Sequence, residues 1–279
     1  MAERYSGDFH IHTGVACSFY SSFYHAVTFG SGSGIAEIYY LNRYHVPLPN
    51  AIGIAMLKYG ISRLSLFFCC GIYVLLDCSF VRSNFLEYNW YLLIGYFFTF
   101  LTGVIFFFLC LSPRLFNLIF GIVNWLSKKL PKWNEKFPQV IHQLAQIQNQ
   151  LMVMQKECHD LVRDGYRIYS IFIFNFIKYT LLYMIPYVLL HSKYGITILD
   201  SLAMTSLIAI LSSVIPAPAG IGSTEFVFTL LFSIVVGDVA AMSSALMYRL
   251  ATFVFPFVIG AAGIVIVRGM RIAMRRWRA

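Results

Sequence analysis

Two short segments of the form GxGxxE place a carboxylate beside flexible backbone, and each is followed at a distance by an arginine. The first segment ends at Glu37 and the second at Glu225. Arg63 follows Glu37 by 26 residues, and Arg249 follows Glu225 by 24. Glycine lets the backbone approach a ligand closely, and the guanidinium fork of arginine matches carboxylate and phosphate oxygens. These residue types could therefore form a binding site in which the arginines contact a phosphate.

Each of these charged residues also has a structural interpretation, and the sequence leaves both open. Glu37 and Glu225 can cap helices, because an acid near a helix N-terminus is stabilised by about 0.3–1 kcal/mol. Arg63 and Arg249 can be ion-pair partners of the two glutamates. Lys178 lies nine residues into an apolar segment, where its stem either carries the charge toward an interface or contributes to the binding site.

The remaining reactive side chains predict neither catalysis nor metal binding. The six cysteines show no CxxC spacing and no histidine at ligand spacing, so we interpret them as packing residues. No nucleophile with a neighbouring base stands out, and no GxxxxGK[ST] segment for ATP binding is present. We therefore expect no catalytic residue, no metal site and no cofactor.

The composition is typical of a membrane protein. Hydrophobic residues make up 59% of the 279 positions and charged residues 12%, against about 45–50% and about 25% in soluble domains. A helix needs about 20 apolar residues to cross a bilayer, and the sequence predicts such spans at 51–76, 90–111, 169–190, 196–215 and 239–267. Two further apolar pieces, 15–30 and 226–236, are too short to cross reliably.

Basic residues gather at the ends of apolar runs and give the net charge of +9. The connection 112–168 carries eight Lys/Arg, and the tail 268–279 is rich in arginine. Lys and Arg accumulate on the cytoplasmic side, so we expect both segments, including a surface helix within 138–167 and the C-terminus, to be cytoplasmic. This placement favours anionic headgroups over nucleic acid as the partner.

The repeated GxGxxE motif predicts an internal duplication within one transmembrane domain, 1–279. The first repeat and its following span cover 15–111, and the second repeat covers 169–267. With a cytoplasmic connection and tail, the two repeat spans point in opposite directions. We therefore expect an all-α polytopic fold with two inverted repeats, each containing a re-entrant hairpin before a long span. The expected hairpin backbone residues are Gly32, Gly34, Pro216, Pro218, Gly220 and Gly222.

The segment 215–225, Tyr248-Arg249-Leu250 and the run 256–260 resemble the membrane domain of lysylphosphatidylglycerol synthases, the multiple peptide resistance factors of bacteria. The segment 32–41 is similar to the first motif of that family. The resemblance covers about residues 25–268, and it implies translocation of aminoacylated phosphatidylglycerol in the bacterial cell membrane and a role in resistance to cationic antimicrobial peptides.

Three functions follow from the residues and the resemblance. The first is a lipid flippase or lipid-binding module whose two hairpins meet in a central polar cavity. In this hypothesis the two arginines, Arg63 and Arg249, hold a lipid phosphate, and the two glutamates, Glu37 and Glu225, hold an amine such as that of a lysyl headgroup. The second is phosphatidylglycerol lysyltransferase activity, which the family name implies, although this sequence contains no soluble transferase domain. The third is a non-transporting partner of a separately encoded synthase. Anionic or aminoacylated phospholipids are the expected ligands, and a second copy of the chain and such a synthase are candidate protein partners.

Overall fold

The computed structural model describes residues 9–30, 32–85, 89–112, 121, 155, 158–160, 162–215 and 217–265. Within these residues the chain forms helices and no strands. Five of the described helical stretches are long and apolar enough to cross a membrane: Leu48–Leu76, Trp90–Leu111, Ile168–Tyr194, Pro218–Val236 and Asp238–Val265. The prediction of an all-α polytopic membrane protein is confirmed.

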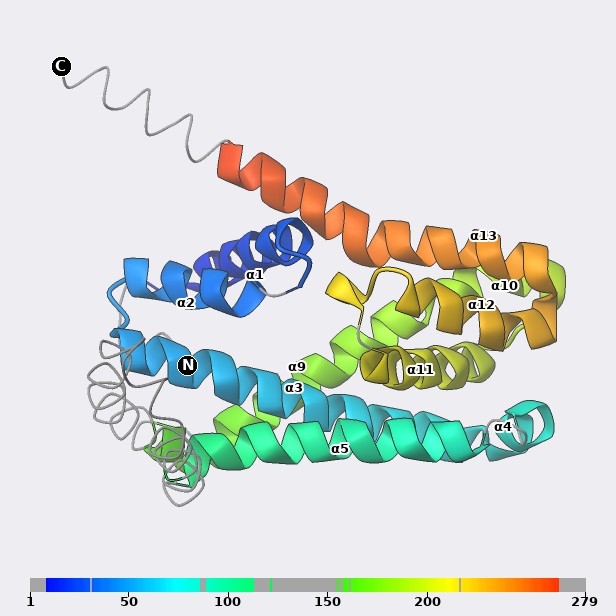
Figure 1. Cartoon of the computed structure of the whole chain (residues 1–279), viewed down its shortest axis with the longest axis horizontal. Coiled ribbons are helices and arrows are strands. Elements are labelled where there is room, and N and C mark those ends of the chain that lie inside the picture. Colours follow the sequence, from blue (N-terminus) through cyan, green and yellow to red (C-terminus); the bar gives the residue numbers. More distant parts are fainter. Residues whose placement is uncertain are drawn as a thin grey trace, which may run out of the picture.

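The first half of the fold places a helical hairpin on a pair of long helices (Figure 1). α3 begins directly after Pro47 and carries Pro49 in its first turn, where a missing N–H costs no helical hydrogen bond. α3 packs along α5 at Gly60, where an added Cβ would lie 3.0 Å from the backbone nitrogen of Phe107. The elements are α1 (Ile11–Val27), α2 (Ser33–Arg43), α3 (Leu48–Leu76), α4 (Cys78–Phe85) and α5 (Asn89–Leu111).

The second half begins with a helix that crosses α3 and ends with a long, locally widened helix. α13 passes into the π-helical turn η4 and continues as α-helix over 255–265. Pro256 lacks the N–H that a regular helix requires, which accounts for the change of winding beside it. The elements are α9 (Gly165–Tyr183), α10 (Ile185–Tyr194), α11 (Ile198–Val214), η3 (Pro218–Gly220), α12 (Ser223–Val236), α13 (Asp238–Arg249) and η4 (Leu250–Val254).

Two predicted lengths differ from the structure. The segment 196–215 forms α11, whose 17 residues make it shorter than the five candidate spans. α11 begins at Ile198 because Thr197 and Asp200 form a capping box, in which Asp200 Oδ2 accepts from the Thr197 N–H at 2.8 Å. The short piece 226–236 instead begins at Ser223 and, counted from Pro218, is long enough to cross.

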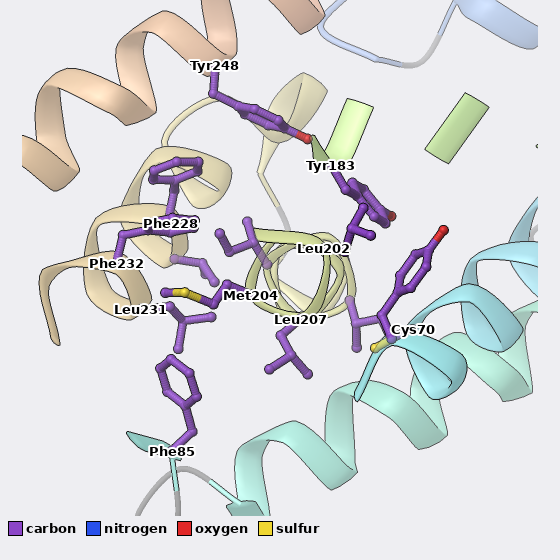
Figure 2. Close-up of a cluster of buried hydrophobic side chains, with 14 of the residues drawn as sticks. Cys70, Phe85, Tyr183, Leu202, Met204, Leu207, Phe228, Leu231, Phe232 and Tyr248 are labelled. Carbon is purple, nitrogen blue, oxygen red and sulfur yellow. The ribbon is translucent and has the colours of Figure 1, made fainter. Parts of the chain in front are cut away.

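The main core surrounds α11, which packs against α3, α5 and α12 (Figure 2). Met204, Leu207 and Ile208 of α11 are buried there. The rings of Phe228 and Phe232 from α12 stack at 4.3 Å beside them. Because α11 is buried among these elements, it fixes the position of α12 relative to α3 and α5.

The two halves repeat one order of elements. A 17-residue helix, α1 or α11, is followed by a break, a shorter helix of 11 or 14 residues, and a long helix. The inverted orientation of these repeats, the domain boundaries and the cytoplasmic C-terminus stay predictions. Most of the connection 112–168, the tail 268–279 and Pro216 lie outside the described residues.

Candidate functional site

The two helical hairpins, α1–α2 (the first hairpin) and α11–α12 (the second hairpin), touch at their turns. Phe29 and Gly30 in the first turn have φ of +51° and +97°, and Ala219 and Gly220 in the second have +55° and +68°. The N–H of Ala219 donates to the carbonyl oxygen of Phe29 at 2.9 Å. The predicted meeting of the hairpins is therefore present as a backbone hydrogen bond between their tips.

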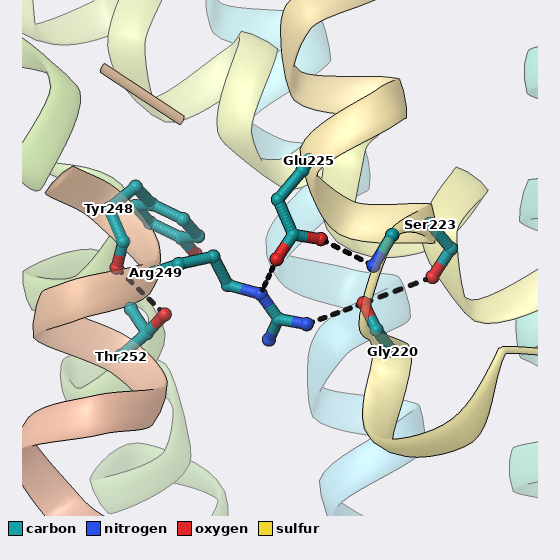
Figure 3. A network of polar contacts seen from close by, with 7 residues as sticks. Gly220, Ser223, Glu225, Tyr248, Arg249 and Thr252 are labelled. Atoms are coloured by element: carbon teal, nitrogen blue, oxygen red, sulfur yellow. Dashed lines mark hydrogen bonds and ion pairs between the residues drawn. The ribbon is translucent and has the colours of Figure 1, made fainter. Parts of the chain in front are cut away.

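The second motif forms a closed polar network at its hairpin tip (Figure 3). Arg249 donates through Nε to Glu225 Oε1 at 2.7 Å and through Nη2 to the carbonyl oxygen of Gly220. Glu225 Oε2 accepts from the N–H of Gly222 at 2.8 Å. The Glu225 side chain thus pairs with Arg249 and also caps the first turn of α12, as the structural interpretation of both residues predicts.

Arg249 retains hydrogen-bonding capacity after these contacts. A guanidinium has five N–H donors, and two of them are used for Glu225 and Gly220. The guanidinium carbon also lies 5.0 Å from the ring centroid of Phe253 in η4, at a distance where a cation and an aromatic ring attract each other. The side chain is only 14% exposed. Three donors of this largely buried cation therefore have no acceptor among the described residues.

The first motif uses a different cation, and the predicted ion pair of Glu37 with Arg63 is wrong. Glu37 Oε1 instead accepts from Lys58 Nζ at 2.8 Å. Arg63 donates through Nε to the hydroxyl oxygen of Tyr59 at 3.0 Å, with its guanidinium carbon 5.0 Å from the centroid of that ring. Among the described residues Arg63 has no carboxylate partner, so its charge is uncompensated.

Lys178 lies in the middle of the candidate span Ile168–Tyr194, on the helix that crosses α3. Its Nζ is 4.3 Å from the ring centroid of Tyr179, and no ion pair to it is present in the described part of the chain. The hydroxyl groups of Tyr179 and Ser62 lie 2.8 Å apart and join α9 to α3 one residue before Arg63. This contact packs the part of α9 that carries Lys178 against the part of α3 that carries Arg63.

The predicted backbone residues divide into those that the turns require and those that they do not. Gly220 and Gly222 have φ of +68° and +85°, which favour glycine. Gly32 donates its N–H to Thr28 Oγ1 at 2.7 Å, and a side chain there would meet the Thr28 side chain. Pro218 starts the 3-10 turn η3. Gly34 has open space around its Cα and no positive φ, so neither space nor conformation requires glycine there.

A polar pocket of about 300 Å³ lies between α1, the start of α2 and η4. His25, Ser21 and Ser22 line it from α1, and Thr252 and Phe253 from η4. The ring of Phe253 joins this pocket to Arg249. These residues were not predicted, although Ser21 and Ser22 precede His25 by four and three residues within an apolar stretch, which is the spacing of one helical face.

The comparisons with known proteins give one match. The family model described as "Lysylphosphatidylglycerol synthase TM region" matches residues 4–260. No curated protein and no solved structure matches the chain.

Proposed function

The chain belongs to the lysylphosphatidylglycerol synthase transmembrane-region family, and from this membership we propose that it binds a phospholipid headgroup at the hairpin tips and moves the lipid between leaflets. We propose aminoacylated phosphatidylglycerol or its anionic precursor as the lipid, and the bacterial cell membrane as the location. Resistance to cationic antimicrobial peptides would follow, because aminoacylation and translocation change the charge of the outer leaflet.

This proposal rests on the hydrogen bonds of the Arg249 guanidinium. Its guanidinium donates to Glu225 and to the carbonyl of Gly220, and the other three of its five donors have no acceptor in the part of the chain that the structure describes. The contact with Phe253 links it to the polar pocket beside the two tips. A pre-oriented guanidinium beside a polar pocket is suited to a phosphate, which arginine binds through paired charge-assisted hydrogen bonds.

The charge balance favours phosphate over amine as the group that is recognised. Lys58, Arg63, Lys178 and Arg249 supply four positive charges, and Glu37 and Glu225 supply two negative ones. Four minus two leaves an excess of two positive charges. Both carboxylates already accept hydrogen bonds from cations, so an incoming amine would have to displace one of them. We therefore assign the open cations to the lipid phosphate and leave the amine to the remaining lone pairs of the glutamates.

Transport in liposomes tests the proposal. Purified protein is reconstituted with labelled phosphatidylglycerol or lysylphosphatidylglycerol, and the lipid that reaches the other leaflet is measured with an impermeant reagent. Arg63→Gln and Lys178→Gln each remove a cation that has no carboxylate partner among the described residues. A charge-assisted hydrogen bond contributes about 1.5–3 kcal/mol, so each change should slow transport roughly 10- to 100-fold.

Two variants of equal charge serve as controls. Arg82 lies on α4 and Lys193 near the end of α10, and neither residue lines the polar pocket beside the tips. Arg82→Gln and Lys193→Gln should transport at the rate of the unmodified protein. Equal rates for all four variants would refute the role of the cations. A rate no higher than in protein-free liposomes, with either lipid, would refute transport itself and favour a non-transporting partner of a synthase.

A further inference from the structure

A second concave surface, separate from the polar pocket beside Arg249, runs between α1, α2 and the helical segment 255–265. This interfacial groove encloses about 440 Å³, and none of its lining residues lines the polar pocket beside Arg249. Its lining residues include Tyr20, Tyr40, Arg43, Tyr44, Gly260 and Gly263. The groove therefore needs its own explanation.

Glycines of the last helix shape the floor of the groove. At Gly260 the helix lies directly against the carbonyl oxygen of Phe19 in α1, so no side chain fits there. One turn later Gly263 has open space, with no atom within 4 Å of an added Cβ. α1 and the last helix thus touch at one glycine and separate at the next. The result is a trench bordered by apolar and aromatic side chains, whose shape suits an extended hydrocarbon chain.

One end of the groove carries an unpaired cation. Arg43 is the last residue of α2, where a positive charge is stabilised by the helix dipole. It is exposed and has no carboxylate partner in the described part of the chain. Tyr40 and Tyr44 are beside it on the same helix end, with hydroxyl oxygens 3.5 Å apart. The span Leu48–Leu76 starts five residues later, so Arg43 lies at the level where arginine and tyrosine meet headgroups.

We propose that the interfacial groove binds one anionic phospholipid, with its phosphate on Arg43 and the tyrosine hydroxyls and one acyl chain in the trench at Gly263. Charge complementarity selects this occupant, because an uncompensated guanidinium next to an apolar trench matches an acidic headgroup joined to a hydrocarbon chain. This site does not depend on the proposed transport, because none of its lining residues lines the polar pocket beside Arg249.

Native mass spectrometry of the detergent-solubilised full chain tests the site. The protein is titrated with phosphatidylglycerol, and in separate arms with phosphatidylcholine and with inorganic phosphate. We expect Arg43→Gln to weaken the binding of one phosphatidylglycerol about tenfold and to leave phosphatidylcholine binding unchanged. Gly263→Leu fills open space and should remove the same bound lipid without lowering the melting temperature. Inorganic phosphate alone should not displace it.

Matched controls separate this site from general effects and from the transport site. Ala262→Leu adds the same side chain at an exposed neighbour outside the groove, and Arg82→Gln removes an exposed arginine from α4. Both should bind lipid like the unmodified protein. Unchanged lipid counts in both Arg43→Gln and Gly263→Leu would overturn the proposal, as would displacement by phosphate alone. If the unmodified protein moves no lipid in the liposome assay but still binds one phosphatidylglycerol in the groove, the proposed function is wrong and the groove site is supported.

Discussion

Replacing Arg249 by alanine gives the most informative measurement on the hairpin tip. The substitution removes the ion pair with Glu225 and the bond to the Gly220 carbonyl together. It also removes the cation beside Phe253. The structure therefore predicts a loss of folding stability in addition to any loss of transport, and the size of the first must be known before the second is interpreted.

The expected loss follows from the burial of the pair. Removing one partner of a buried ion pair costs about 3–5 kcal/mol. Glu225 stays 29% exposed and keeps the N–H of Gly222 after the change, so the lower end, about 3 kcal/mol, applies. At roughly 2–4 °C per kcal/mol for a chain of this size, the melting temperature in detergent should fall by ~6–12 °C.

A double-mutant cycle isolates the pair from the other contacts. Arg249→Ala, Glu225→Ala and the double variant are melted under identical conditions, with the exposed Arg82→Ala on α4 as a control that should stay within about 0.5 kcal/mol. If the two side chains interact, the second substitution lowers the free energy of unfolding by less than it does alone. The free energy lost in the double variant should then be about 1–3 kcal/mol smaller than the sum of the losses in the two single variants.

Additive losses would refute the reasoning, because they would mean that the two side chains do not interact. A second outcome concerns function. If the amount of transport per folded molecule is unchanged in Arg249→Ala, the guanidinium acts on the architecture of the tip and not on the lipid. Transport per folded molecule that falls at least tenfold agrees with the phosphate contact proposed above.

Two further measurements test other parts of the structure. Burial, followed by the neighbouring carboxylate of Asp200, raises the pKa of Asp77 from 3.8 to about 6. The folded protein thus holds this proton more tightly, and the resulting stability is fully present below about pH 3.8 and is lost as the pH rises through about 6. Asp77→Asn should flatten this fall in melting temperature and raise the melting temperature at pH 7.5, whereas a curve parallel to that of the unmodified protein would contradict the assignment. Gly260→Ala should lower stability by about 1–3 kcal/mol, because its Cβ meets the carbonyl of Phe19. Gly263→Ala, in open space, should not, and equal melting temperatures for the two variants would rule out the close packing of α1.

The long spans could be predicted because apolar length alone determines them. Residues 51–76 and 90–111 match α3 and α5 within three residues at each end. The shorter elements depend on local contacts instead. α11 begins only where Thr197 and Asp200 cap it, and α12 begins only after two glycines with positive φ. A hydropathy pattern contains neither of these features, so it did not predict that α11 is shorter than the candidate spans or that the stretch ending at Val236 is long enough to be one.

The partner of Glu37 could not be predicted, for a geometric reason. Lys58 and Arg63 are both on α3, five residues apart, and at 3.6 residues per turn they point about 140° away from each other. Only one of them can face α2, and the side of α3 that faces α2 is fixed by its packing against α5 at Gly60. Spacing along the chain is therefore a good guide to which helix supplies the cation and a poor guide to which residue does.

The polar pocket beside Arg249 could not be predicted, because residues from both halves of the chain line it. Ser21 and His25 come from the first half, and Thr252 and Phe253 from the second. The two halves meet through the hydrogen bond from the Ala219 N–H to the Phe29 carbonyl, which needs positive φ at two residues other than glycine. Such strained conformations persist only where the surrounding structure holds them. A site at this junction depends on both halves of the chain at once, because α1 and the start of α2 line one side of the pocket and η4 with Pro256 lines the other.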